Sequence, residues 1–143
     1  MGRLLGEGLD PSPTLTPQQV VQFQLDAFRE NDNPSRDAGI ARSFRFASPA
    51  NKLVTGPLAH FIEIVRSPAY APLLNCASAK VLRSDVNDDE AKVFVQVVSG
   101  IGRQIYYLFL LSKQKEGEYR DCWMTDGVMP VEPGDQDTDA LAI

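Results

Sequence analysis

Residues 91–126 read AKVFVQVVSGIGRQIYYLFLLSKQKEGEYRDCWMTD, and the rest of the predicted fold is organised around them. They contain two apolar stretches, 91–98 and 104–113, joined by a short turn with two glycines. In each stretch apolar side chains occupy both odd and even positions, so both faces of each predicted strand are apolar. A sheet with one face in water would alternate apolar and polar residues. We therefore expect helices on one face, and either a partner chain or strong curvature of the sheet to cover the other.

Two further strands flank this pair. Before it, Ala79, Val81 and Arg83 alternate with Lys80, Leu82 and Ser84, which predicts a more polar edge strand that ends in a turn at residues 87–89. After it, residues 119–125 are predicted as the fourth strand. Asp126-Gly127 marks the end of that strand or a bulge in it.

Three helices are predicted before the sheet. The first begins at Pro17, because Thr16 and Gln19 have capping-box spacing and Leu15 can pack on Val20. Apolar spacing predicts the second and third helices, and the intervening residues 46–52 lose this periodicity. The helices cover residues 17–30, 37–46 and 58–65. Helices followed by four hairpin-linked strands indicate an α+β domain, with the helices packed on one face of a curved antiparallel sheet of at least four strands.

The length of 143 residues fits one domain, and both ends lack a periodic apolar face. We expect a flexible leader at residues 1–13, a single domain at 14–132 and an acidic, disordered tail at 133–143. Cys76 and Cys122 follow no metal or redox spacing, which favours buried thiols in a reducing compartment, the cytoplasm or the plastid stroma. A disulfide between them is the alternative.

Charge and hydropathy exclude two classes of partner. The net charge is −5, and four of the nineteen acids fall after residue 131, which leaves fifteen acids against fourteen bases before them. A nearly neutral body has no electrostatic footprint for nucleic acid. No run is apolar and long enough to cross a bilayer, and no targeting segment is visible, so we expect a soluble protein without a membrane partner.

Two segments resemble a known family. They are FRFASPANKLVTGPLAHFIEIV, residues 44–65, and DCWMTDGVMPVE, residues 121–132. Both are similar to an uncharacterised domain family of photosynthetic organisms and bacteria, which we place in the nuclear transport factor 2-like superfamily. That resemblance implies a cone, in which a strongly curved sheet wraps over helices, encloses a pocket and dimerises through the sheet. It implies no activity, because the superfamily holds enzymes as well as binding modules.

Few residues have the chemistry of an active site. His60 is the only histidine, which excludes two-histidine zinc sites, and it fits a helical surface position as well as a catalytic one. Asp126 follows Trp123 and Met124 at the end of an apolar strand, where a desolvated carboxylate can act as a base. The alternative is a simple Asp-Gly turn. Tyr106 is a further candidate donor, and no motif indicates a metal or a cofactor.

The sequence favours binding over chemistry. Aromatic side chains are numerous enough to line a ligand pocket, although aromatics are also common in any core. The candidates are Phe44, Phe46, Tyr70, Tyr106 and Trp123. We interpret the domain as a non-catalytic module for a small apolar ligand or a partner peptide, and we expect a homodimer through the sheet. The alternative is a cofactor-independent lyase, isomerase or hydrolase with Asp126 as base and Tyr106 or His60 as donor.

Overall fold

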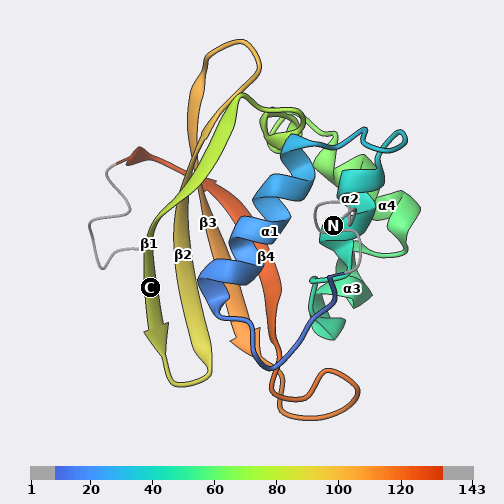
Figure 1. Cartoon of the computed structure of the whole chain (residues 1–143), viewed down its shortest axis with the longest axis vertical. Coiled ribbons are helices and arrows are strands. Elements are labelled where there is room, and N and C mark those ends of the chain that lie inside the picture. Colours follow the sequence, from blue (N-terminus) through green and yellow to red (C-terminus); the bar gives the residue numbers. More distant parts are fainter. Residues whose placement is uncertain (1–8, 134–143) are drawn as a thin grey trace, which may run out of the picture.

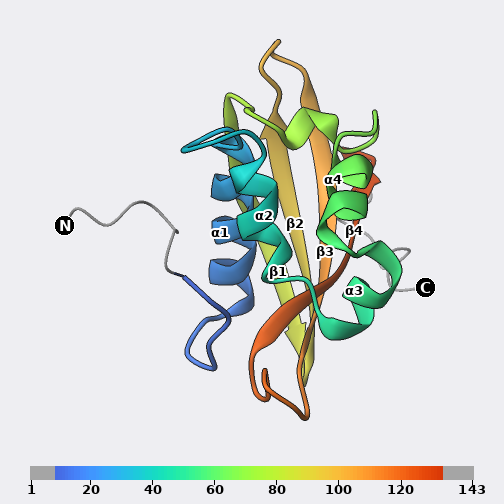
Figure 2. The same cartoon turned by 90° about the vertical axis from the view of Figure 1, so that its right-hand side faces the viewer.

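The structure is a computed structural model that describes residues 9–133. Four helices and one 3₁₀ turn precede a four-stranded antiparallel sheet, which is an α+β arrangement as predicted. The helices all lie on one face of the sheet (Figures 1 and 2). The elements are α1 (Pro17–Arg29), α2 (Ala38–Phe44), α3 (Pro49–Thr55), α4 (Leu58–Val65), η1 (Ala71–Leu73), β1 (Ser78–Asn87), β2 (Glu90–Val98), β3 (Gln104–Lys113) and β4 (Trp123–Val131).

The first helix begins as its sequence predicts. The Thr16 side chain accepts from the Gln19 N–H at 3.1 Å, and the Gln19 side chain accepts from the Thr16 N–H at 2.9 Å. The reciprocal capping box is therefore confirmed, with Pro17 at the first helical position. The apolar face of α1 packs on the sheet, where Val20 and Leu25 are fully buried with Val95.

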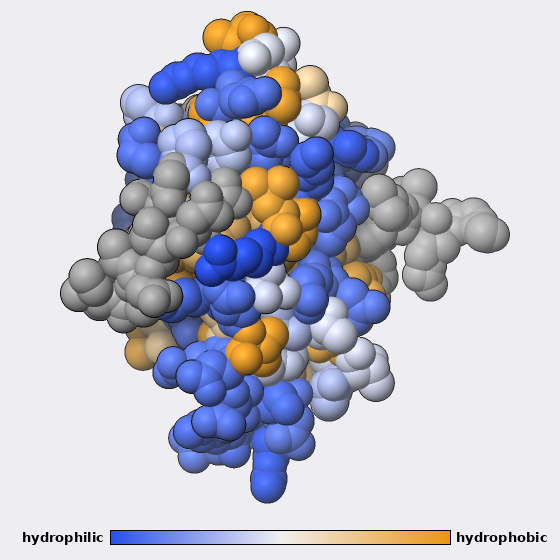
Figure 3. Space-filling view, turned by 90° about the vertical axis from the view of Figure 1, so that its left-hand side faces the viewer, coloured by the Kyte–Doolittle hydropathy of each residue, from blue (hydrophilic) through white to orange (hydrophobic). Residues whose placement is uncertain are grey.

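The expected cone is not confirmed, because the sheet is open and is not strongly curled. Its strands follow the order β1-β2-β3-β4, so β1 and β4 are the two edges. Strong curvature was inferred from apolar residues on both faces, but side chains of the sheet itself cover part of the outer face. Phe94 is 2% exposed, with the Arg83 guanidinium 5.0 Å from its ring centroid. Figure 3 shows this face as separate apolar patches among polar side chains.

Two elements differ from the sequence prediction. α3 forms within the predicted loop, because the Ser48 side chain accepts from the Asn51 N–H at 3.1 Å and Pro49 starts the helix. No residue of α3 is buried, so it has no apolar stripe for sequence periodicity to find. β4 starts at Trp123 and not at Tyr119, after a turn in which Asp121 has a φ of 69°. It continues past Asp126 to Val131, so of the two predicted alternatives at Asp126-Gly127 the bulge is confirmed and the strand end is not.

The chain ends are described only in part. The expected leader overlaps the described residues at 9–13, where Leu9 packs against the core and its carbonyl accepts from Arg45 Nη1 at 3.1 Å. Residues 1–8 and nearly all of the expected tail lie outside the described residues. Within residues 9–133, no helix is long and apolar enough to cross a membrane. The expected homodimer stays a prediction.

Candidate binding pocket

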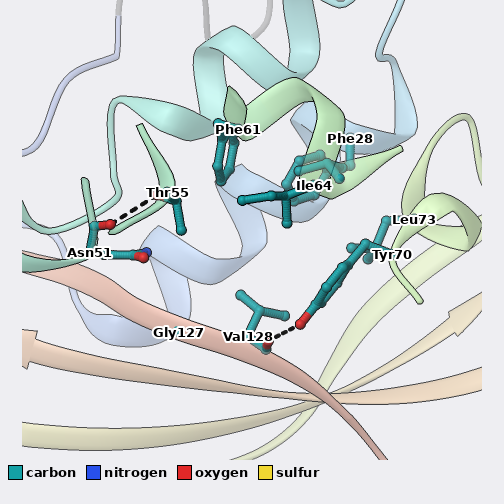
Figure 4. Close-up of a pocket in the computed structure, with 10 residues that line it drawn as sticks. Phe28, Asn51, Thr55, Phe61, Ile64, Tyr70, Leu73, Gly127 and Val128 are labelled. Atoms are coloured by element: carbon teal, nitrogen blue, oxygen red, sulfur yellow. Dashed lines mark hydrogen bonds between the residues drawn. The ribbon is translucent and has the colours of Figure 1, made fainter. Parts of the chain in front are cut away.

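A pocket of about 170 Å³ lies between β4 and the layer formed by α3, α4 and η1. Its lining is mostly aliphatic and aromatic, with a carboxamide and two hydroxyl groups (Figure 4). The lining residues are Phe28, Asn51, Thr55, Phe61, Ile64, Val65, Tyr70, Leu73, Gly127 and Val128.

The short helix α3 forms one wall. Asn51 and Thr55 are one turn apart and so share the face of α3 that lines the pocket. Asn51 Nδ2 donates to the Thr125 carbonyl at 3.2 Å, and Thr55 Oγ1 donates to the Asn51 carbonyl at 2.9 Å. The opposite face of α3 presents Leu53, which is 88% exposed, to solvent. Hydrogen bonds to β4, and not a buried apolar stripe, therefore hold this wall in place.

The aromatic wall comes from α4 and the η1 segment. Phe61 on α4 packs against Phe44, with the ring centroids 4.8 Å apart. Tyr70 stacks on the buried Tyr107 at 6.2 Å, and its hydroxyl donates to the Val128 carbonyl at 2.7 Å. Tyr70 is therefore held at both ends, by the ring of Tyr107 and by the edge of β4.

The hydroxyl of Tyr107 anchors the same segment and gives a pH test. It donates to the Ala69 carbonyl at 2.8 Å, and burial, with a smaller effect of neighbouring Tyr70, raises the pKa of Tyr107 to about 12. The pKa of Tyr107 is higher in the folded protein than in the unfolded chain, so the neutral hydroxyl stabilises the folded state. This stabilisation is fully present below about pH 10 and is lost as the pH rises through about 12.

We expect Tyr107→Phe to be less stable than wild type at pH 8, by about 1 kcal/mol for the lost hydrogen bond. That difference should shrink between about pH 10 and 12, since only wild type has this buried hydroxyl to ionise. Urea unfolding of both proteins at several pH values measures the difference directly and cancels the titration of the other groups. A constant difference over the whole range would contradict the prediction.

β4 forms the floor of the pocket. Its Thr125 pairs outward with the segment before α3, through Thr125 N–H to the Phe46 carbonyl and Ser48 N–H to the Thr125 carbonyl, both at 2.8 Å. The register with β3 shifts between Leu110 and Leu111, which leaves Asp126 without a partner residue. This is a β-bulge at Asp126. It lies between Thr125, which pairs with the segment before α3, and Gly127 and Val128, which line the pocket.

The pocket is almost without charge. Among its ten lining residues, Tyr70 is the only one with a titratable side chain. Lys52, on α3, has its Nζ 5.4 Å from the ring centroid of Phe44 and 5.5 Å from that of Tyr119. Burial between these rings lowers the pKa of Lys52. In residues 9–133 no cluster of three His, Cys, Asp or Glu side chains can hold a metal ion.

The five aromatic residues predicted to line a pocket are divided among several environments. Tyr70 lines the pocket, whereas Phe46 and Trp123 are buried in the core and Phe44 packs behind Phe61. Tyr106 lies on the outer face of the sheet, since it alternates with the inward-facing Tyr107. Two of the five predicted aromatic residues are therefore part of the core, and only one lines the pocket.

The three candidate catalytic residues do not converge on the pocket. Asp126 and His60 are both exposed, and neither lines the pocket. The Tyr106 hydroxyl accepts from Gln96 Nε2 at 3.1 Å on the outer face. Leu110, opposite the bulge at Asp126, is about 13 Å along β3 from Tyr106 at roughly 3.3 Å per residue. The expected burial of Asp126 beside Trp123 does not occur, because the bulge leaves Asp126 exposed in the strand interior.

Sequence reasoning missed most of the lining. Four of the lining residues belong to segments with no apolar periodicity, namely Asn51, Thr55, Gly127 and Val128. Tertiary contacts bring these segments together, among them the parallel bridge between Ala47 and Thr125. The one local signal was the Ser48-Pro49 pair, which starts a helix as readily as a turn.

The fold and the pocket define the class of this protein. It is an α+β domain with helices on one face of an open antiparallel sheet and a small apolar pocket at one edge strand. The chain belongs to the family described as a domain of unknown function (DUF4864), whose model matches residues 13–138. No curated protein and no solved structure matches the chain. The broader placement in the nuclear transport factor 2-like superfamily stays a prediction, since the helix-before-sheet order agrees with it and the open sheet does not.

Proposed function

We propose that this domain is a non-catalytic binding module whose pocket takes a small, largely apolar molecule. The observation that carries the proposal is a pocket of about 170 Å³ lined almost entirely by uncharged side chains. An apolar protein cavity of about 150 Å³ is large enough for benzene, so this volume suits a molecule with one ring. Drug-sized ligands occupy pockets of roughly 300 Å³ or more, which is well above the space available here.

The polar groups of the pocket support binding over catalysis. General acid–base chemistry needs two titratable groups within reach of one substrate, and this lining offers only Tyr70. The hydroxyl of Tyr70 and that of Thr55 already donate to backbone carbonyls. The catalytic alternative would require Asp126, His60 or Tyr106 to act at a surface outside this pocket.

A partner peptide is less favoured as the occupant. Peptides that add to a sheet need a free edge with regularly spaced N–H and C=O groups. Thr125 already pairs with the segment before α3, and Pro130 has no N–H to donate. A small molecule does not need a row of free backbone N–H and C=O groups along the edge of β4.

Filling the pocket should weaken binding strongly, and α-methylstyrene is a suitable probe because it is a neutral molecule with one ring. We expect wild type to bind it with a Kd on the order of 1 mM or below, as expected for so few heavy atoms. Ile64→Trp places an indole at a half-buried lining position and should weaken binding at least about tenfold by occupying the volume. Titration followed by amide chemical shifts measures both affinities.

Ala59→Trp is the matched control, since it adds the same indole at an exposed position of the same helix. It should change the affinity by less than about twofold, as surface substitutions usually have small effects. If wild type shows no saturable shifts in the pocket residues, or if both tryptophan variants bind like wild type, the proposed pocket is not a binding site. Turnover of the probe or of related esters that depends on Asp126 would instead favour the catalytic alternative.

A further inference from the structure

The edge of β4 carries one polar group that the pocket leaves for a ligand. We propose that the ligand is a neutral molecule with a single hydrogen-bond acceptor, such as a carbonyl or ether oxygen, that accepts from the backbone N–H of Val128. This inference rests on the proposed function, because it names the class of molecule that the same pocket takes.

The register of β3 and β4 shows which way the Val128 N–H points. In an antiparallel pair, opposed residues alternate between pairs that exchange hydrogen bonds and pairs that do not. Thr125 uses its N–H and C=O outward, toward Phe46 and Ser48, so its pair with Leu111 is of the second kind. After the bulge opposite Leu110, the next pair is Val128 with Phe109, which is again of the second kind.

One contact and the position of Pro130 agree with this direction. The Val128 carbonyl accepts from the Tyr70 hydroxyl on the pocket side, away from β3. In such a pair the N–H of a residue points to the same side as its carbonyl, so the Val128 N–H also faces the pocket side. Two residues further on, the position with the same orientation is Pro130, which has no N–H. Val128 is therefore the one N–H donor that residues 127–131 direct away from β3.

This donor lacks a protein acceptor. Within residues 9–133, the Val128 N–H makes no hydrogen bond outside the strand ladder, whereas the carbonyl of the same residue is bonded to Tyr70. Val128 is a half-buried residue among apolar side chains, so its N–H gains a hydrogen bond from an acceptor that a ligand brings. The Tyr70 ring and Phe61 provide the apolar surface on either side for the rest of the molecule.

The acceptor is expected to be neutral. No lysine, arginine or histidine is among the ten lining residues, so a carboxylate or phosphate would lose its hydration without gaining a counter-charge. Lys52, the basic residue of α3, is held between Phe44 and Tyr119 and does not line the pocket. A ketone, aldehyde, ester or ether of single-ring size satisfies both the volume and the charge of the site.

A pair of nearly isosteric probes tests the inference. Acetophenone and α-methylstyrene share a ring and differ at one position, where a carbonyl oxygen replaces a methylene carbon. Val128→Pro removes the N–H at a position with the same orientation as the natural Pro130, so the ladder with β3 loses no hydrogen bond. Val128→Ala keeps the N–H and shortens the side chain, and it serves as the control.

We expect Val128→Pro to weaken acetophenone binding about five- to tenfold more than it weakens α-methylstyrene binding, since one neutral hydrogen bond is lost with acetophenone alone. Val128→Ala should affect the two probes equally. In wild type, the Val128 amide proton should move downfield with acetophenone and not with α-methylstyrene, a measurement that does not depend on the folding of any variant.

Three results are possible, and each decides the question. Loss specific to acetophenone together with the downfield shift supports the inference. If both probes bind but the Val128 amide and the Val128→Pro variant do not distinguish them, the inference is overturned and the proposed binding function stands. If neither probe binds wild type, both proposals fail.

Discussion

Replacing Gly39 with alanine is expected to lower the free energy of unfolding by about 3 kcal/mol or more, because the added methyl group meets backbone that cannot yield. A Cβ at this position would lie 2.0 Å from the Ala27 carbonyl oxygen and 2.7 Å from the Asn31 Cα. The N–H of Gly39 also donates to the Asn31 carbonyl at 2.8 Å. To accept the methyl group, α2 would have to move away from the C-terminal end of α1.

Gly100→Ala is the matched control, since its Cβ would meet only the Asn75 carbonyl oxygen at 3.6 Å. This substitution should lie within about 0.5 kcal/mol of wild type. For a domain of this size, the expected loss at Gly39 corresponds to a decrease in Tm of roughly 10 °C. Thermal unfolding of the two variants and wild type gives the comparison. Equal Tm values for both alanine variants would show that α1 and α2 are not packed this closely.

Replacing Gln24 with leucine should cost about 3 kcal/mol, since it leaves more than one buried polar group without its partner. Gln24 is 3% exposed on α1, and its Nε2 donates to the carbonyl and to Oγ of Ser43 at 3.1 Å and 3.2 Å. Its Oε1 accepts from Thr125 Oγ1 at 2.6 Å. One side chain therefore joins α1 to α2 and to β4, directly behind the strand that forms the pocket floor.

A double-mutant cycle separates this network from a general packing effect. Thr125→Val should be destabilising in wild type and much less so in the Gln24→Leu background, because the two changes remove both partners of one hydrogen bond. Gln18→Leu makes the same substitution at an exposed position of α1 and should have little effect. Additive losses in the cycle would contradict a direct coupling between Gln24 and Thr125.

Where the predictions from sequence succeeded, the deciding interactions are local. The start of α1 needs only residues within one turn, Thr16, Pro17 and Gln19, and the capping box forms as predicted. β2 and β3 are long apolar runs with a short turn between them, so neighbouring residues are sufficient to predict their pairing. Apolar residues at helical spacing likewise predicted α4 at residues 58–65.

Where they failed, the deciding partner is distant in the sequence. α3 depends on hydrogen bonds from Ser48 and Asn51 to Thr125, more than seventy residues away. The sequence left open whether Asp126-Gly127 ends β4 or forms a bulge in it, and the pairing of β3 on both sides decides for the bulge. Apolar residues on both faces of the sheet predicted a partner chain or strong curvature, but Arg83 packs over Phe94 without any closure of the sheet.

Periodicity and capping act over a few residues, so the order of the elements and the apolar character of the sheet can be predicted from the residues alone. The position of the pocket depends on tertiary contacts. Its lining joins residues near 28, 51–73 and 127–128, which are brought together by the bridge from Ala47 to Thr125 and by the Tyr70 hydroxyl on Val128. Such contacts depend on how the layers pack. Close packing buries side chains such as Phe46 and Trp123 in the core, although their chemistry would also suit a ligand pocket.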